Sequence, residues 1–357
     1  MKAESKKFLK KLLATISPSG YEEEAARVWL AEAETISPHT KHDVHGNAHV
    51  VINKGGFPRV ILTGHYDEIG FIISHIDDKG FIYIQPIGGW DPQISQGQRV
   101  TILGKSGKIQ GVIGKAPVHW SREEGDKNIT KIGQQWVDIG TTSKEETEKL
   151  VAIGDPLVLA QDFMELQGDR FACRGCDDKL GAFIVLEVGR ILAERKIAPE
   201  VHIVATCQEE VGLRGSKTAA FGVDAHIGIA TDVTFATDHP RVGDNLYKYG
   251  DIKIGSGAVV TRGPNIHPRL FEKIQEVAGL HKIKMQVDAE GGLTGTDARE
   301  LQVCRSGMIT GLISIPNRYM HSPCELCDYA DVEACVSLIA ETVAAITPDT
   351  NFDILKK

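Results

Sequence analysis

The apolar positions of the first seventy residues change from a helical to a strand-like period. Residues 4–16 and 21–34 carry apolar side chains on one face at helical spacing, which predicts two amphipathic helices. Residues 42–54 and 59–71 contain runs of Val and Ile that are typical of strands. We interpret the first run as an outer strand pair and the second as a buried strand that ends in polar side chains.

A different pattern occupies residues 71–159. Short apolar runs alternate with frequent glycines, and no long helical period appears until residues 143–151. Short strands of this kind, separated by turns, are typical of small antiparallel barrels. The pattern therefore predicts a β-rich insertion.

The remainder of the chain, from about residue 169, alternates between helical and strand-like segments. Such alternation predicts a largely parallel sheet covered by helices on both faces. The predicted helices are 180–195, 269–280 and 331–346, and the predicted strands are 201–210, 226–233 and 308–316.

Taken together, the patterns predict an α/β fold with a mixed, largely parallel sheet flanked by helices. One domain is expected to comprise residues 1–70 and 160–357, and residues 71–159 are expected to form a second domain inserted into it. A chain of 357 residues is long enough for two cores.

Composition and charge narrow the classes of function. Hydrophobic residues make up 42% of the chain and charged residues 25%, as in ordinary soluble proteins. A net charge of -8 argues against nucleic acids and anionic membranes as partners. No apolar run approaches the roughly 18 residues of a membrane span. The seven cysteines do not suggest a disulfide framework, so we expect a cytoplasmic protein.

Several predicted strands end in residues that could form a site. Glu209 and Glu210 follow one strand, and His65, Asp232 and His321 lie at or beyond the ends of others. Ligands bind α/β proteins at the carboxyl ends of strands. Adjacent carboxylates repel each other unless a cation or a shared proton compensates them. Each feature alone has an ordinary alternative, a solvated turn for the glutamates and a hydrogen-bonded core residue for a histidine.

Five side chains of these types favour a metal centre. Imidazole and carboxylate ligands together favour zinc, cobalt or manganese over calcium. A carboxylate shared by two ions about 3.5 to 4 Å apart would activate a water as the nucleophile. The glutamate doublet could then supply one ligand and one base. The candidate ligands are His65, Asp177, Glu210, Asp232 and His321.

Six motifs support a more specific interpretation. They are GHYDEIGF at 64–71, CDDKLG at 176–181, QEEVGLRGS at 208–216, ATDVT at 230–234, GTDA at 295–298 and IPNRYMHSPCE at 315–325. In this order they resemble the motifs of the tetrahedral (TET) and glutamyl aminopeptidases. These are dinuclear metallopeptidases that also include deblocking aminopeptidases and proteins once labelled endoglucanases. The resemblance covers essentially the whole chain.

The resemblance implies a ligand set for two divalent ions per subunit, zinc or cobalt. His65 and Asp232 would hold one ion and Glu210 and His321 the other, with Asp177 bridging them. The implied activity is hydrolysis of the N-terminal peptide bond of short peptides by a water activated by the two metals.

Further roles are implied by the same resemblance. Glu209 would be the general base, and Asp67 would orient a histidine ligand, as carboxylates do in many metal sites. A cis peptide is expected between Asp177 and Asp178.

The GTDA motif is expected to lie near the substrate. Thr296 and Asp297 would then contribute to substrate binding. The alternative is that Thr296 only caps a helix.

The family fold implies that residues 71–159 form a dimerisation domain. Dimers of this kind can assemble into a hollow tetrahedral dodecamer that admits peptides and excludes folded proteins. The residues outside the insertion would form the catalytic metallopeptidase domain.

Two cysteine pairs leave alternatives open. Cys173 and Cys176, and Cys324 and Cys327, have the spacing of zinc ligands, although most of one domain separates the pairs. They could hold a structural metal, form a redox-sensitive thiol pair, or be ordinary buried cysteines. Cys176 also departs from the family, which usually has an apolar residue before the aspartate doublet.

Two rival functions remain. A glycoside hydrolase of the endoglucanase type, acting on β-glucans, would need two opposed carboxylates about 5 to 9.5 Å apart and no metal. Glu209 and Glu210 are neighbours, and the histidines would have no purpose in that reaction. A non-enzymatic scaffold would be expected to have lost a ligand or the base, and none is missing.

Overall fold

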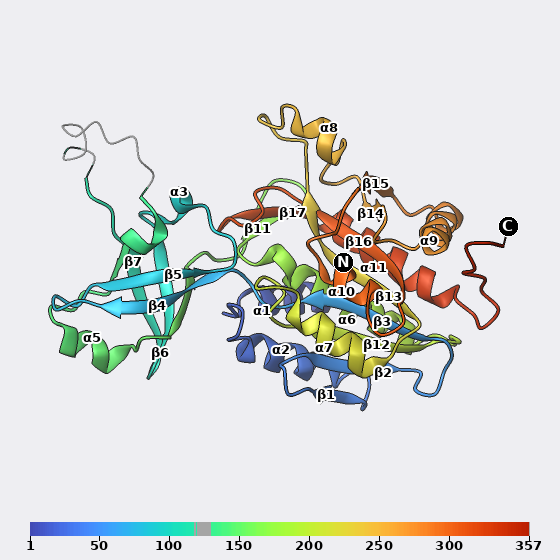
Figure 1. Ribbon diagram of the computed structural model, residues 1–357, viewed down its shortest axis with the longest axis horizontal. Coiled ribbons are helices and arrows are strands. Elements are labelled where there is room, and N and C mark those ends of the chain that lie inside the picture. The colour runs from blue at the N-terminus through green and yellow to red at the C-terminus, as the bar shows by residue number, and fades with distance from the viewer. Residues whose placement is uncertain (118, 120–129, 357) are drawn as a thin grey trace.

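The computed structural model describes residues 1–117, 119 and 130–356. Its largest element is an eight-stranded sheet in the order β1-β2-β12-β3-β13-β16-β14-β15 (Figure 1). The strands are β1 (Thr40–His42), β2 (Ala48–Ile52), β3 (Arg59–His65), β12 (Glu200–Thr206), β13 (Ile227–Phe235), β14 (Ala258–Arg262), β15 (Met285–Ala289) and β16 (Ile309–Asn317).

The sheet is mixed and its centre is parallel, as the sequence predicts. Strands β12, β3, β13 and β16 run in the same direction. Strands β1 and β2 form the expected antiparallel pair at one edge, and β14 runs antiparallel to β16 at the other side. The carboxyl ends of the four central strands therefore meet at one edge of the sheet.

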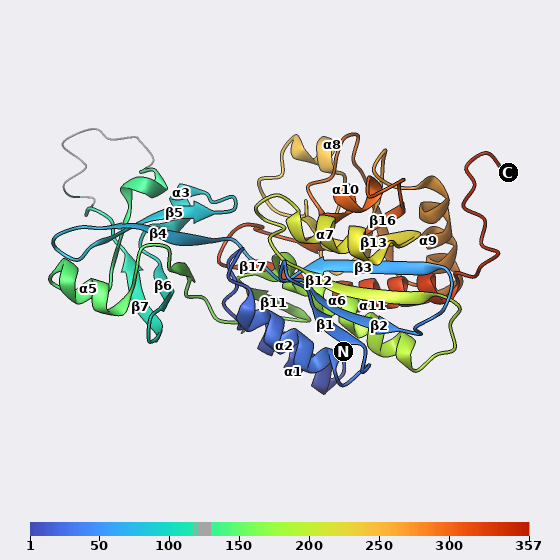
Figure 2. The same cartoon turned by 60° about the horizontal axis from the view of Figure 1, so that its bottom comes forward.

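Helices cover both faces of this sheet (Figure 2). Helix α6 packs against β3 and β13 on the same face as α11, and α7 and α10 cover the opposite face. The helices are α1 (Ala3–Leu13), α2 (Glu23–Ala33), α6 (Cys176–Ala193), α7 (Arg214–Val223), α8 (Asn245–Tyr249), α9 (Pro268–His281), α10 (Asp297–Gln302) and α11 (Tyr329–Ala344).

Apolar spacing explains why the first helix forms where it does. Its buried side chains are Phe8, Leu9, Leu12 and Leu13, which share one face at helical spacing. The second helix contacts α1 and β2, and the indole nitrogen of Trp29 donates to the main-chain oxygen of Ala182 in α6 at 2.9 Å. The two predicted N-terminal helices are confirmed.

A closed barrel follows β3 and lies apart from the large sheet (Figure 1). Its strand order is β4-β5-β8-β7-β6-β9, and it has an apolar core separate from that of the sheet. Residues 118 and 120–129 of the predicted insertion lie outside the described part of the chain. The barrel elements are β4 (Gly70–Ile76), β5 (Ile82–Ile87), α3 (Pro92–Ser95), β6 (Arg99–Gly104), β7 (Gly107–Ile113), a 3-10 turn (Ile132–Gln134), β8 (Trp136–Asp138), α5 (Lys144–Leu150) and β9 (Pro156–Leu159).

A small antiparallel sheet is the remaining element. Its order is β10-β11-β17, with β10 (Met164–Glu165), β11 (Arg170–Cys173) and β17 (Glu325–Asp328). Strand β17 pairs with β11, so the segments before the start of α6 and after His321 lie side by side. No helix in the described part of the chain combines the length and apolar character needed to cross a bilayer.

Close packing between β3 and α6 depends on Gly64. A Cβ atom at this position would lie 2.3 Å from the main-chain carbon of Gly181. We expect Gly64→Ala to force the strand and helix apart and lower the free energy of unfolding by about 1–3 kcal/mol. Urea unfolding of the purified protein measures this change.

The matched control is Gly222→Ala in α7, where a Cβ would meet no described atom within 4 Å. Alanine is the better helix former, so this variant is expected to be neutral or to gain up to about 1 kcal/mol. Equal unfolding midpoints for the two variants would contradict the packing argument.

Candidate metal centre

Two groups of candidate ligands lie at the carboxyl edge of the sheet. One consists of His65, Glu209 and Asp232, and the other of Asp177, Glu210 and His321. Within each group, one potential ligand atom from each residue lies within 4.8 Å of the others. Parallel strands bring these residues together, because β3, β12 and β13 all end here. The structure thus brings together all five sequence-predicted ligands and the predicted base.

Asp177 lies between the two groups. Its Oδ1 atom is 3.3 Å from Nε2 of His65, and its Oδ2 atom is 3.4 Å from Nε2 of His321. On the far side, Nε2 of His321 is 3.3 Å from Oε2 of Glu210. Nε2 of His65 is 3.9 Å from Oδ1 of Asp232. One carboxylate therefore presents an oxygen to each half of the centre.

The chain turns sharply at this position. The peptide bond between Asp177 and Asp178 is cis, as expected, and both residues have non-helical backbone angles at the start of α6. The carboxylate of Asp178 accepts hydrogen bonds from the main-chain nitrogens of His65 at 3.2 Å and Gly181 at 2.9 Å. Asp178 therefore joins the end of β3 to the first turn of α6.

The electrostatics of the centre favour positive charge. Burial raises the pKa of Asp232 well above its usual range, although His65 opposes this, and burial also raises the pKa of Glu210 to about 6. Hydrogen bonds to Asp177 and Glu210 raise the pKa of His321 to about 11. Buried carboxylates that repel one another need a cation or a shared proton to compensate them.

Two carboxylate oxygens remain available to a ligand. Oε1 of Glu209 and Oε1 of Glu210 are buried and accept no hydrogen bond from the described residues. A buried acceptor without a partner is energetically costly. These two oxygens are therefore suited to bind a metal ion or to accept a proton during the reaction. The donor set of imidazole and carboxylate groups fits a divalent transition-metal ion.

Asp67 supports one half of the centre. Its carboxylate accepts hydrogen bonds from the main-chain nitrogens of Glu209 at 3.0 Å and Glu210 at 3.2 Å, and from Oγ of Ser19 at 2.6 Å. Nδ1 of His65 lies 3.1 Å from the main-chain oxygen of Asp67 and 3.4 Å from its carboxylate. Asp67 therefore fixes both the histidine ring and the turn that carries the two glutamates.

Glu325 supports the other half. Its Oε2 atom accepts a hydrogen bond from the main-chain nitrogen of Asp177 at 2.9 Å, and its Oε1 atom accepts one from that of His321 at 3.0 Å. Glu325 is the last residue of the motif at 315–325, but the sequence alone assigned it no role. The available signal was an acid at the start of a short strand, four residues after a candidate ligand.

A buried ion cluster lies beneath the centre. Glu68 pairs with Arg174 and with Nζ of Lys179, the latter at 2.7 Å. Both cations also donate to the main-chain oxygen of Thr15, at 3.0 Å and 2.9 Å. The cluster joins the segment after α1 to the start of α6. Lys179 therefore has a buried ionic partner in Glu68.

The cysteine pairs do not form a metal site. Cys173, Cys176 and Cys327 are buried, whereas Cys324 is exposed, and all seven cysteines are free. Within the described residues, no group of three candidate ligands includes a cysteine. The four-cysteine alternative raised by the sequence is therefore not supported.

A cavity of about 360 Å³ opens beside the centre. Thr296 lines it, and its Oγ1 atom caps α10 by accepting from the main-chain nitrogen of Ala298 at 3.3 Å. Asp297 is placed differently from the expectation, since it is buried, is absent from the lining and accepts a hydrogen bond from Oγ1 of Thr206 at 2.7 Å. At the start of α10, the side chain of Thr296 therefore faces the cavity, whereas that of Asp297 faces the protein interior.

Comparison with known proteins identifies the family. Residues 46–338 match the profile of the M42 glutamyl aminopeptidases. The chain belongs to the M42 glutamyl aminopeptidase family. The family predicted from the six motifs is thereby confirmed, and members of this family are hydrolases that act as aminopeptidases.

Relatives of this M42 protein match over nearly their full length. A lysyl aminopeptidase from Pyrococcus furiosus is 35% identical, over 96% of this chain and 97% of that one. A TET aminopeptidase from a Thaumarchaeota archaeon has a TM-score of 0.92 at 30% identity, covering 97% and 98% of the two chains. The TET1 peptidase of Pyrococcus horikoshii has a TM-score of 0.85 at 31% identity, covering 96% and 100%. The α/β fold with its barrel is thus shared with solved TET aminopeptidases.

The role of Glu325 can be tested by a conservative change. Glu325→Gln keeps the shape but replaces one accepting oxygen with an amide group that cannot accept, so one of the two main-chain donors loses its partner. We expect the affinity for zinc or cobalt to fall by about 10–100-fold. Calorimetric titration of the purified protein with each metal measures the change.

Glu341→Gln is the matched control, because Glu341 lies in α11 and pairs with Arg195 at 2.9 Å, away from the candidate ligands. It is expected to bind metal as the unaltered protein does. An unchanged affinity in Glu325→Gln would show that the centre does not depend on this support.

Proposed function

We propose that this M42 aminopeptidase hydrolyses the N-terminal peptide bond of short peptides, using two divalent ions, zinc or cobalt. The observation that carries the proposal is the position of Asp177. Its two carboxylate oxygens face Nε2 of His65 and Nε2 of His321 at nearly equal distances. A single carboxylate so placed is suited to bridging two ions.

The proposed ligands follow from this arrangement. His65 and Asp232 would hold one ion, and Glu210 and His321 would hold the other, with Asp177 shared. Bound divalent ions lower the pKa of a coordinated water and polarise a carbonyl group. The unpartnered, buried oxygen of Glu210 and the buried acids around it support this assignment.

Glu209 is proposed as the general base. It lies beside the centre, with one carboxylate oxygen 3.7 Å from Nε2 of His65 and the other buried without a partner among the described residues. In the reaction, Glu209 accepts a proton from the attacking water and returns it to the leaving amine. Its main-chain nitrogen is held by Asp67, so the carboxylate keeps a defined position.

Substrate binding would take place in the adjoining cavity. The free α-amino group of a peptide would lie among the acidic side chains of the centre, which restricts cleavage to the first bond. Thr296, which lines the cavity, is proposed to contact the substrate, whereas the buried position of Asp297 favours a supporting role.

A glycoside hydrolase is the weaker alternative. Glu209 and Glu210 are sequence neighbours that flank one cavity wall, rather than opposed carboxylates. The histidines interleave with the acids, which a metal-independent glycosidase does not require. The family and its named relatives also favour the aminopeptidase.

Replacing the proposed base tests the mechanism. Glu209→Gln is expected to reduce the rate of aminoacyl-nitroanilide cleavage by about 10²–10⁴-fold, because glutamine cannot accept the proton. Metal content should be retained, since Glu209 is not a proposed ligand. Initial rates and elemental analysis of the same preparation measure both quantities.

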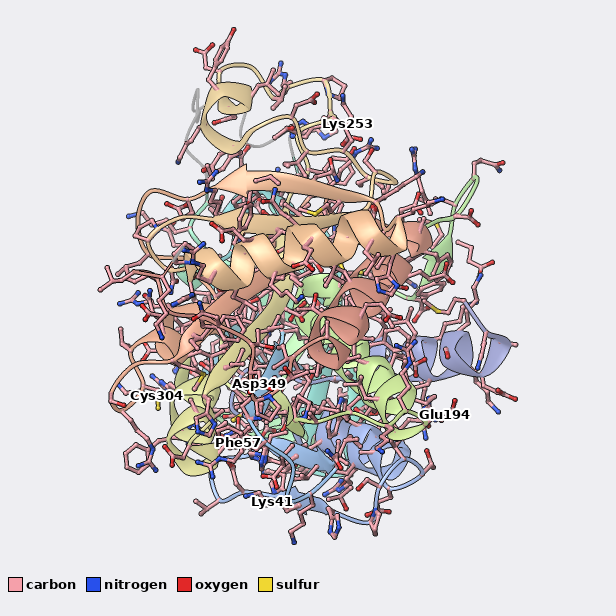
Figure 3. The ribbon with its side chains drawn as sticks, turned by 90° about the vertical axis from the view of Figure 1, so that its right-hand side faces the viewer. Lys41, Phe57, Glu194, Lys253, Cys304 and Asp349 are labelled. Carbon is pink, nitrogen blue, oxygen red and sulfur yellow. The ribbon has the colours of Figure 1, made fainter. Side chains whose placement is uncertain are left out.

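Glu194→Gln is the control, an exposed residue at the end of α6 that is labelled in Figure 3. It should leave the rate unchanged. Chelation of the unaltered protein should abolish nitroanilide cleavage, and zinc or cobalt should restore it. Cleavage of carboxymethylcellulose that survives chelation, without any nitroanilide cleavage, would instead favour the glycosidase.

The proposal also covers how subunits associate and where the protein is located. We propose that residues 71–159 are a dimerisation domain, and that residues 1–70 and 160–357 form the catalytic metallopeptidase domain. The barrel has its own core and lies apart from the sheet, which supports a separate role for it (Figure 1). The free cysteines support a cytoplasmic location, and short peptides are the proposed substrates, with no nucleic-acid or membrane partner.

The oligomeric state can be measured directly. The Pyrococcus horikoshii relative can assemble into a tetrahedron or a large octahedral shell. We expect light scattering on the purified protein to give the mass of a dimer or of twelve subunits. A stable monomer at micromolar concentration would contradict assembly through the barrel.

A further inference from the structure

The far end of the cavity carries acids that the proposed mechanism does not use. Asp288 lies on β15 and Glu290 directly follows that strand, and both line the cavity. Among the described residues of the lining there is no lysine or arginine. The ions proposed at the centre would compensate the acids near them, so Asp288 and Glu290 remain as negative charge facing the cavity.

Strand register places Asp288 on the same face of the sheet as the centre. Asp288 pairs with Thr261 on β14, and Thr261 lies two residues from Val259, which pairs with Ser314 on β16. Ser314 in turn pairs with Asp232 on β13. Side chains two residues apart on a strand share a face, and Asp288, Thr261, Ser314 and Asp232 all line the one cavity.

The distance between β13 and β15 determines which substrate side chains can span the cavity. Three strand spacings lie between β13 and β15, which corresponds to about 14 Å between their backbones. Carboxylates that extend inward from both strands shorten this gap. A residue whose α-amino group lies at the centre can reach Asp288 only with a long side chain.

Chemistry along the path also suits a long, basic side chain. Leu312, on β16 between β13 and β15, and Phe235, at the end of β13, contribute apolar surface to the lining of the cavity. Lysine and arginine carry an apolar stem that packs on such surfaces and a charged head that needs an acceptor. Glutamate is too short to reach Asp288, and its negative charge is disfavoured in a cavity lined by acids.

The carboxylate of Asp288 has an oxygen that could accept a hydrogen bond from a cationic side chain. Its Oδ1 atom is buried and accepts no hydrogen bond from the described residues. Burial raises the pKa of Asp288 above its usual range, although hydrogen bonds from Thr261 and Thr234 oppose this. Lys248 lies over the ring of Tyr249 and adds positive charge near Glu290, so Asp288 is the stronger of the two attractors.

We propose that Asp288 is a specificity-determining residue that selects substrates with N-terminal lysine or arginine, and that Glu290 assists it. The inference rests on the proposed aminopeptidase function. It adds the substrate class, because the centre itself contacts atoms common to every peptide.

The test compares four nitroanilides, of lysine, arginine, leucine and glutamate. The unaltered, metal-loaded protein should favour the two basic substrates over leucine by at least about tenfold in kcat/KM, with glutamate poorest. Asp288→Asn should lower kcat/KM for lysine and arginine by about 10–100-fold, mainly through KM, since a pairing made in both ground and transition states is lost. Leucine should change less than about threefold.

Asp349→Asn is the matched control, an exposed acid after α11 that does not line the cavity and is labelled in Figure 3. It should reproduce the unaltered profile. Metal-dependent cleavage of leucine that equals or exceeds that of lysine would overturn the inference and leave the proposed function standing. An equal loss on all four substrates in Asp288→Asn would also overturn it. Failure to cleave any nitroanilide would remove the proposed function itself.

Discussion

Repulsion among buried carboxylates is the constraint on which this structure depends. Parallel strands that end at one edge of the sheet place Glu210 and Asp232 beside Asp177, which lies at the start of α6. Their mutual repulsion and desolvation are unfavourable until cations compensate them. The surrounding protein holds the acids in place through hydrogen bonds to the backbone, with Asp67 fixing one half and Glu325 the other. The fold thus holds a group of acids whose remaining negative charge a divalent cation would balance.

Sequence predicted the parts of the fold that have strong periodicity. The N-terminal helices, the central strands and the largely parallel sheet were expected because long apolar runs determine them. Strands β14 and β15 were not placed, since each has five residues and β15 is half-exposed at the sheet edge. The sequence also did not predict the role of Glu325, because that role depends on the pairing of β17 with β11, two segments far apart in the chain.

Residue types and strand ends indicated the candidate ligands, and the family resemblance divided them between two ions. The sequence could not separate Thr296 from Asp297, because only the structure shows that one lines the cavity and the other is buried. Asp288 had no motif to distinguish it. The position of Asp288 relative to the centre follows from the pairing of distant strands, and no local sequence pattern contains this information. The proposed chemistry and the proposed selectivity would therefore occupy opposite ends of one cavity.

Anomalous diffraction from crystals loaded with zinc or cobalt tests the central claim most directly. The account predicts two peaks per subunit, about 3.5 to 4 Å apart, with Asp177 between them. His65 and Asp232 should contact one peak, and Glu210 and His321 the other. A single peak, or density located only at the buried cysteines, would contradict the two-ion centre.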